Sequence, residues 1–240
     1  MRRVRRCADP AELAETVAHA LLERLVAIQR EGRMPQIVLT GGSIADRIHR
    51  ATADRAGGSG VDWTQVVWWW GDERFVASDS AERNARQARH SLLDVVGALP
   101  EQIHEVPARE EAADPDAAAV AYAREIDVHG GDTFDLVMLG VGPDGHVASL
   151  FPGSAQLAET DRLCVGVTGS PKPPPERVSL TFPALNRARS VWFVVSGTDK
   201  ADAVARALTE PPPLVADLPA IGVTGSVETV WFVDRAAHPG

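Results

Sequence analysis

The sequence predicts an α/β fold, in which a mostly parallel sheet is covered by helices on both faces. Short strand-like runs alternate along the chain with segments of helical period. Two of these runs, residues 66–70 and 134–139, are apolar at nearly every position, as in strands that are buried on both faces. The chain has 240 residues, of which 45% are hydrophobic and 24% charged, as in globular proteins. We expect a single domain that spans residues 1–240.

The elements of the first half follow in order. Asp9 and Pro10 have the residue types that begin a helix, and Gly32 ends it. A strand over residues 37–40 leads into a second helix, which starts at residues 41–43 and ends near residue 57. The next elements are a strand over residues 66–70, a helix over 84–96 and a weak strand over 103–106.

The second half is equally patterned. Asp114 caps an alanine-rich helix that the glycines at 130–131 end, and a strand over residues 134–139 follows. Strands over 163–168 and 178–181 flank a proline-rich loop at 171–175. The remaining elements are a strand over 191–195, a helix over 198–208 and a last strand over 229–233.

Composition excludes several classes of function. Acidic residues outnumber basic ones by 33 to 24, which argues against a general nucleic-acid binder. No apolar run approaches the ~20 residues of a membrane span. The two cysteines provide neither a disulfide framework nor a metal site. With no signal peptide recognised and few thiols, we expect a cytoplasmic protein without a metal or cofactor.

The distinctive polar residues follow predicted strands. They are the segments at 41–43 and 72–74, and Asp144 with His146. Since ligands of parallel sheets bind beyond the carboxyl ends of the strands, we expect these three segments to converge on one site.

The glycine-rich segments each allow more than one interpretation. A helix begins at Gly41, Gly42 and Ser43, and the backbone N–H groups at such a helix start attract phosphate. A plain turn with Ser43 as N-cap is the structural alternative. A third interpretation makes Ser43 a serine nucleophile. Residues 140–145 match G-x-G-x-x-G, but Asp144 would face a pyrophosphate and Pro152 leaves little room for the required helix. This argues against a dinucleotide site.

Side chains near these loops suggest roles in catalysis and binding. His146 lies in the turn after an apolar strand and can take a proton from water, while Asp144 can fix its tautomer. Asp72 and Arg74 lie in either a solvated turn or a ligand site, in which Arg74 could bind phosphate and Asp72 could orient or abstract a proton. Lys200 starts a helix, a position where a cation is favoured only if an anion binds nearby.

Five segments resemble those of the 6-phosphogluconolactonase family, which belongs to a superfamily shared with glucosamine-6-phosphate deaminase. The segments are LTGGS (39–43), WGDER (70–74), NAR (84–86), FDLVMLGVGPDGHVASLFP (134–152) and PERVSLT (175–181). They are distributed in order over nearly the whole chain. The resemblance implies a modified Rossmann-like fold and a metal-independent hydrolase of the pentose phosphate pathway, which converts 6-phospho-D-glucono-1,5-lactone to 6-phospho-D-gluconate. We expect the chain to act as a monomer.

The resemblance also implies roles for single residues. His146 and Asp144 match the catalytic pair, and the other implied residues contact the substrate, several of them its phosphate: Gly41, Gly42, Ser43, Asp72, Arg74, Arg177 and Lys200. The role of Lys172 stays open. The family usually has Thr-Pro near Ile44 and Ala45, so a threonine hydroxyl is missing from the phosphate loop.

Two other functions stay open beside lactone hydrolysis. The sister deaminases carry an extra acid in an Asn-Glu-Pro segment, where this chain has Ser149, Leu150, Phe151 and Pro152. Because ring opening needs that acid and lactone hydrolysis does not, the replacement favours a lactonase over an isomerase or deaminase. A sugar-phosphate-binding protein without turnover is the other alternative, which the presence of His146 disfavours.

Overall fold

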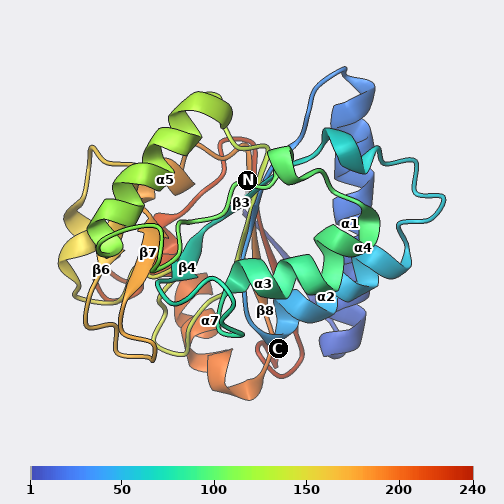
Figure 1. Cartoon of the computed structure of the whole chain (residues 1–240). Coiled ribbons are helices and arrows are strands. Elements are labelled where there is room, and N and C mark those ends of the chain that lie inside the picture. Colours follow the sequence, from blue (N-terminus) through green and yellow to red (C-terminus); the bar gives the residue numbers. More distant parts are fainter. Residues whose placement is uncertain (1, 240) are drawn as a thin grey trace.

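A computed structural model describes residues 2–239. Its main sheet has six parallel strands in the order β1-β9-β8-β5-β2-β3. Figure 1 views this sheet nearly edge-on. These strands are β1 (Arg2–Cys7), β2 (Gln36–Leu39), β3 (Val67–Trp70), β5 (Leu136–Leu139), β8 (Ser190–Val195) and β9 (Glu228–Asp234). The predicted α/β class with a mostly parallel sheet is confirmed.

Helices cover both faces of this sheet. On one face lie α1 (Pro10–Arg30), α2 (Ser43–Asp54), and the continuous segment of α3 (Asn84–Ala88), a π-helical turn (Arg89–Leu93) and α4 (Asp94–Val96). On the other lie α5 (Pro115–His129), α6 (Phe182–Leu185) and α7 (Ala201–Leu208). The helices predicted around residues 10–32, 84–96 and 198–208 are therefore confirmed.

The strands of the main sheet contribute to two hydrophobic cores, because successive side chains point to opposite faces. Trp68 and Trp70 pack with α1 and α2, whereas Trp69 packs with α5. All three indoles are fully buried. The tryptophan run is thus core, as its apolar pattern predicted.

A second sheet of three antiparallel strands lies beside the first, in the order β4-β7-β6. It contains β4 (Asp72–Arg74), β6 (Cys164–Val167) and β7 (Arg177–Leu180). The last two strands flank the proline-rich loop, as predicted. This small sheet and α5 lie together on the same side of the main sheet (Figure 1).

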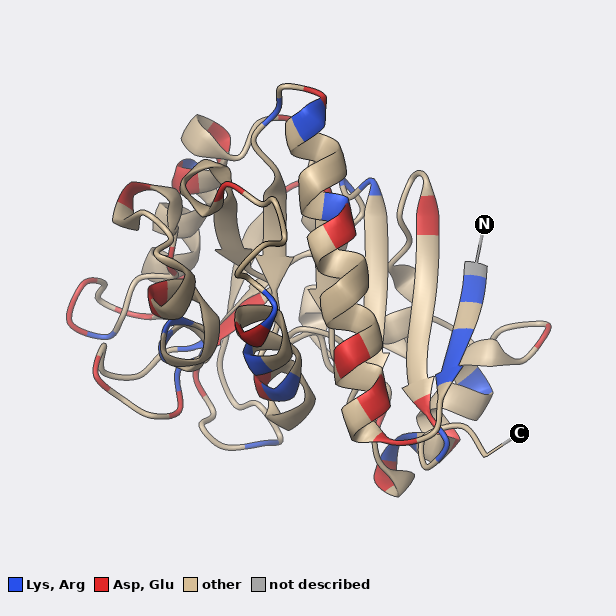
Figure 2. Ribbon diagram, turned by 90° about the vertical axis from the view of Figure 1, so that its right-hand side faces the viewer, with Lys and Arg blue, Asp and Glu red and all other residues tan. Residues whose placement is uncertain are grey.

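Three elements differ from what the sequence analysis described. Residues 103–106 do not form a strand, because Ile103 makes only an isolated bridge to Trp68. The segment 72–74, for which a solvated turn was one alternative, is strand β4. Strand β1 was not predicted, because its arginines lack the apolar pattern of a strand. It pairs with β9 at the edge of the sheet. Its basic residues are blue in Figure 2.

The strand order creates a crevice between β2 and β5. From β2 the chain proceeds to β3 on one side, whereas β5, β8 and β9 extend the sheet on the other side. The loops after β2 and β5 therefore diverge, which is the arrangement that accommodates ligands in open α/β sheets. Among residues 2–239, no helix is long and apolar enough to cross a membrane.

Candidate active site

A cleft of about 330 Å³ lies at the carboxyl ends of β2, β5 and β8. Every residue that the sequence placed in the site lines it except Asp144. The predicted residues along its wall are Gly41, Gly42, Ser43, Asp72, Arg74, His146, Arg177 and Lys200. The three expected loops therefore converge, and they are joined by Lys172 from the proline-rich loop.

Asp144 lies behind His146 rather than on the wall of the cleft. Its Oδ1 is 2.6 Å from Nδ1 of His146. Burial raises the pKa of Asp144, but the hydrogen bond and the electrostatic attraction of the His146 ring, together with the charge of Lys172, outweigh burial and hold this pKa below its usual range. Because an ionised carboxylate only accepts hydrogen bonds, Nδ1 of His146 carries a proton and Nε2 of the neutral ring is the basic nitrogen.

The close approach of His146 requires a glycine at position 142. A Cβ atom at Gly142 would lie 1.9 Å from Nδ1 of His146 and 2.4 Å from Oδ1 of Asp144. On its other side the imidazole ring packs against Phe151, with 4.6 Å between ring centroids. The turn thus fixes both the position and the tautomer of the histidine.

The glycine loop after β2 begins helix α2. The N-cap is Gly42, with φ of +99°, rather than Ser43, and no side chain caps the helix. The first N–H groups of α2 are therefore available to an anion, and the helix dipole favours negative charge there. At Gly41 the side chain of Asn84 approaches so closely that a Cβ atom would lie 1.8 Å from its Oδ1.

Arg74 and Lys200 place two cations on the wall of the cleft. Arg74 donates from Nη1 to the carbonyl of Glu82, and its buried Nε has no partner among the described residues. Nζ of Lys200 lies 2.8 Å from the carboxylate of the exposed residue Asp199. Both cations can therefore turn to a bound phosphate at small cost.

Arg177 and Asp72 form a buried pair that holds two loops. Arg177 donates to the carbonyls of Lys172, Pro173 and Pro174, each at 3.1 Å, and its Nη1 lies 3.8 Å from Oδ2 of Asp72. Asp72 in turn accepts a 2.6 Å hydrogen bond from Ser149 Oγ. Burial lowers the pKa of Arg177, opposed by the charge of Asp72. Their hydrogen bonds therefore connect the proline-rich loop to the segment after His146.

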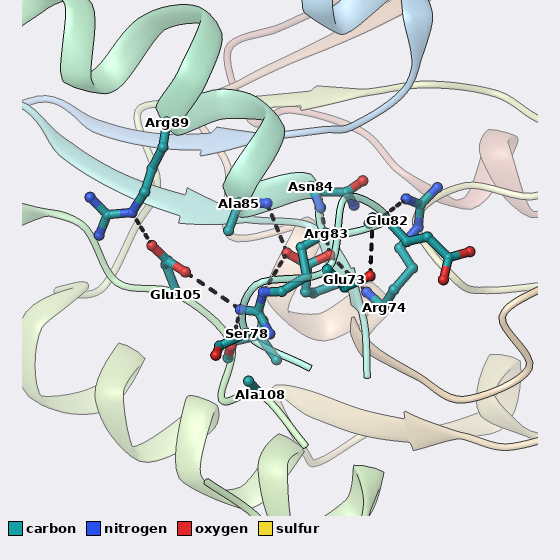
Figure 3. A network of polar contacts seen from close by, with 12 residues as sticks. Glu73, Arg74, Ser78, Glu82, Arg83, Asn84, Ala85, Arg89, Glu105 and Ala108 are labelled. Carbon is teal, nitrogen blue, oxygen red and sulfur yellow. Dashed lines mark hydrogen bonds and ion pairs between the residues drawn. The ribbon is translucent and has the colours of Figure 1, made fainter. Parts of the chain in front are cut away.

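Glu73 is a buried residue that the sequence analysis did not single out. Its carboxylate accepts hydrogen bonds from the backbone N–H groups of Arg74, Asn84 and Ala85 at 2.7–2.8 Å (Figure 3). Burial raises its pKa to about 7, while Arg83 and the three donors favour the ionised form. Glu73 thereby joins the segments 70–74 and 84–86, whose motifs were noted separately.

The described residues contain no group of three or more His, Cys, Asp or Glu side chains that could hold a metal ion. The cleft combines one imidazole that is oriented by a carboxylate, four cationic side chains and a helix N-terminus. Such a set suits an anionic substrate that undergoes proton transfer to and from water.

Comparison with known proteins identifies relatives over most of the chain. The family described as glucosamine-6-phosphate isomerases/6-phosphogluconolactonase matches residues 8–231. The 6-phosphogluconolactonase of Streptomyces coelicolor is 42% identical over 238 residues, which cover 95% of this chain and 90% of the relative. The 6-phosphogluconolactonase of Mycobacterium leprae is 44% identical over 232 residues, with coverage of 94% and 89%.

Solved structures agree with these sequence matches. The crystal structure of 6-phosphogluconolactonase from Thermotoga maritima has a TM-score of 0.83 at 29% identity and covers 98% of this chain and 100% of that one. A monomeric glucosamine-6-phosphate deaminase shares the fold, with a TM-score of 0.80 at 17% identity. The predicted resemblance is therefore confirmed, and the chain belongs to the glucosamine-6-phosphate isomerase/6-phosphogluconolactonase family.

Proposed function

We propose that this chain hydrolyses 6-phospho-D-glucono-1,5-lactone to 6-phospho-D-gluconate, with His146 as the general base. The observation that carries the proposal is the Asp144–His146 pair, which leaves Nε2 of the histidine free beside a cleft lined by cations. The names of the relatives at 42% and 44% identity support the same substrate.

Proton transfer at His146 accounts for both halves of the reaction. Nε2 takes a proton from water as the water oxygen forms a bond to C1 of the lactone. The tetrahedral oxyanion is stabilised by N–H groups of the glycine-rich turns or by Arg177. The C1–O5 bond then breaks, and the imidazolium returns its proton to the departing ring oxygen. The carboxylic acid product ionises to the carboxylate.

The substrate phosphate is held at the other end of the cleft. The uncapped N-terminus of α2, Arg74 and Lys200 provide donors of the kind that phosphate prefers. An anchored phosphate fixes the lactone carbonyl relative to Nε2 of His146, so binding energy is used for orientation. Gly41, Gly42 and Ser43 contribute through the backbone.

The segment after His146 favours hydrolysis over the isomerase or deaminase reaction. Ser149 is buried, and its hydroxyl is occupied by Asp72. An additional acid for ring opening is therefore not supplied by residues 149–152. We further propose that the chain is one domain, since the loops that line the cleft all surround the same six-stranded sheet. We also propose that it acts as a monomer in the cytoplasm, where its two free cysteines would stay reduced.

The test is a pair of assays on the purified chain. Lactone hydrolysis is followed by proton release, corrected for the uncatalysed rate, and the deaminase reaction by ammonia release from glucosamine 6-phosphate. The proposal predicts turnover of the lactone alone. Turnover of the amino sugar would favour the deaminase, and saturable binding of 6-phosphogluconate without turnover of either substrate would favour a binding protein.

A further inference from the structure

We propose that Lys172 is a positioning residue of this reaction, whose ammonium group lies beside Asp144 and the ring of His146 and favours the unprotonated, base-competent form of the histidine. The inference rests on the proposed function. It concerns a residue whose role the sequence left open, one of only two lysines in the chain, both of which line the cleft.

The side chains of Lys172, Asp144 and His146 form a compact cluster. Nζ of Lys172 lies 3.4 Å from Nδ1 of His146 and 3.7 Å from Oδ1 of Asp144. Because Nδ1 of His146 already donates its proton to Asp144, it has no lone pair to offer the ammonium group. Lys172 therefore pairs with the carboxylate, while its charge lies directly beside the imidazole ring.

Hydrogen bonds within the proline-rich loop hold the backbone of Lys172 in place. Arg177 donates to the carbonyl of Lys172 itself and to those of the next two residues. Ser170 adds two more contacts, since its Oγ donates to the carbonyl of Lys172 at 3.0 Å and accepts from its N–H at 3.3 Å. Lys172 is thus anchored through its backbone on both sides.

Charge balance explains what such a lysine does. A carboxylate at hydrogen-bond distance stabilises the imidazolium form of a histidine, and a protonated histidine cannot accept a proton from water. A cation 3.4 Å from the ring opposes this effect. The pair Asp144–Lys172 therefore orients His146 without the full increase in proton affinity that Asp144 alone would cause.

Charges of both signs surround Lys172. Lys200 and Arg177 are the other cations that influence it, and Asp199 is a further carboxylate, which Lys200 and Lys172 influence. Burial lowers the pKa of Lys172, and the charge of Asp144 opposes that effect. Phe151 packs an uncharged ring against His146. A substitution of Lys172 leaves all these neighbouring residues in the sequence, so that it removes one charge from the surroundings of His146.

The experiment compares Lys172→Met, Lys172→Arg and a matched control. Arg187→Met removes the same charge from an exposed residue that precedes β8, at the opposite edge of the sheet from the cleft. Two quantities are measured for each protein: the pH profile of kcat/KM between about pH 5.5 and 8, and the NMR titration of the His146 ring protons, assigned with His146→Gln.

The inference predicts a specific change. In Lys172→Met the acidic limb of the profile and the titration midpoint of His146 both move to higher pH, by about one pH unit. Lys172→Arg restores most of the shift, and Arg187→Met leaves both quantities in place. A uniform loss of kcat at every pH with an unmoved midpoint would overturn the inference and make Lys172 a group that contacts the substrate directly.

The two proposals fail in different ways. A wild-type chain with no lactonase activity at any pH contradicts the proposed function, while the NMR titration still measures the effect of Lys172 on His146. An active wild type with an unchanged midpoint in Lys172→Met contradicts only the inference about Lys172.

Discussion

Gly142→Ala tests whether the placement of His146 controls the rate. The alanine Cβ would lie 1.9 Å from Nδ1 of His146, whereas real Cβ atoms essentially never approach closer than 3.0 Å. The ring must therefore retreat by at least about 1.1 Å, the difference between these two distances. Asp144 must move as well, because its Oδ1 would lie 2.4 Å from the same atom.

A displacement of this size changes catalysis more than stability. A misplacement of about 1 Å costs roughly 100-fold in rate, so kcat should fall by about that factor while KM changes little. The backbone tolerates alanine, since Gly142 is not among the glycines with positive φ. The side chain of His146 borders the cleft and has space to move, so the free energy of unfolding should fall by no more than about 1–2 kcal/mol.

The assay is steady-state lactone hydrolysis together with urea unfolding. Gly57→Ala is the matched control, because a Cβ at Gly57 meets nothing within 4 Å and its φ is not positive. It should keep the wild-type kcat. A Gly142→Ala variant that retains more than about a third of the wild-type kcat, with its fold intact, would refute the argument that this turn fixes the catalytic histidine.

Three further substitutions test other parts of the site. His146→Ala should lower kcat by ~10²–10⁴ at unchanged circular dichroism and Tm, because the general base is lost; a variant with normal turnover would remove His146 from this role. Lys200→Ala should raise KM about 10-fold for the phosphorylated lactone but far less for gluconolactone, and equal effects on both substrates would exclude a phosphate contact. Glu73→Ala should lower the free energy of unfolding by about 3–5 kcal/mol in urea titrations, since it leaves Arg83 and three N–H donors without their buried acceptor; a loss below about 1 kcal/mol would contradict this.

The sequence by itself determined the class of fold and the edge of the sheet that carries the site. Both are encoded in short segments. An apolar run such as residues 134–139 identifies a buried strand, and the glycine-rich turn that follows it places His146 beyond the strand end. Since parallel strands share one carboxyl edge, strand assignments alone were enough to predict that residues 41–43, 72–74 and 144–146 converge.

Local pattern was insufficient where an element depends on a distant partner. Strand β1 is held by parallel pairing with β9, more than 220 residues away, and its arginines show no apolar alternation. Glu73 became a buried anchor because β4 turns into the second sheet and meets the start of α3. Residues 103–106 have strand-like composition but find only one bridge to pair with.

The tertiary structure also determined which partners the predicted residues contact. The sequence grouped Asp72 and Arg177 with the substrate contacts. Both line the cleft, and their hydrogen bonds also hold Ser149 and the proline-rich loop. The position of Lys172 beside Asp144 follows from those bonds and has no local signature. Residue type and spacing specify which chemistry a chain can perform, but the partner of each charge is set only when segments far apart in sequence pack together and exclude water.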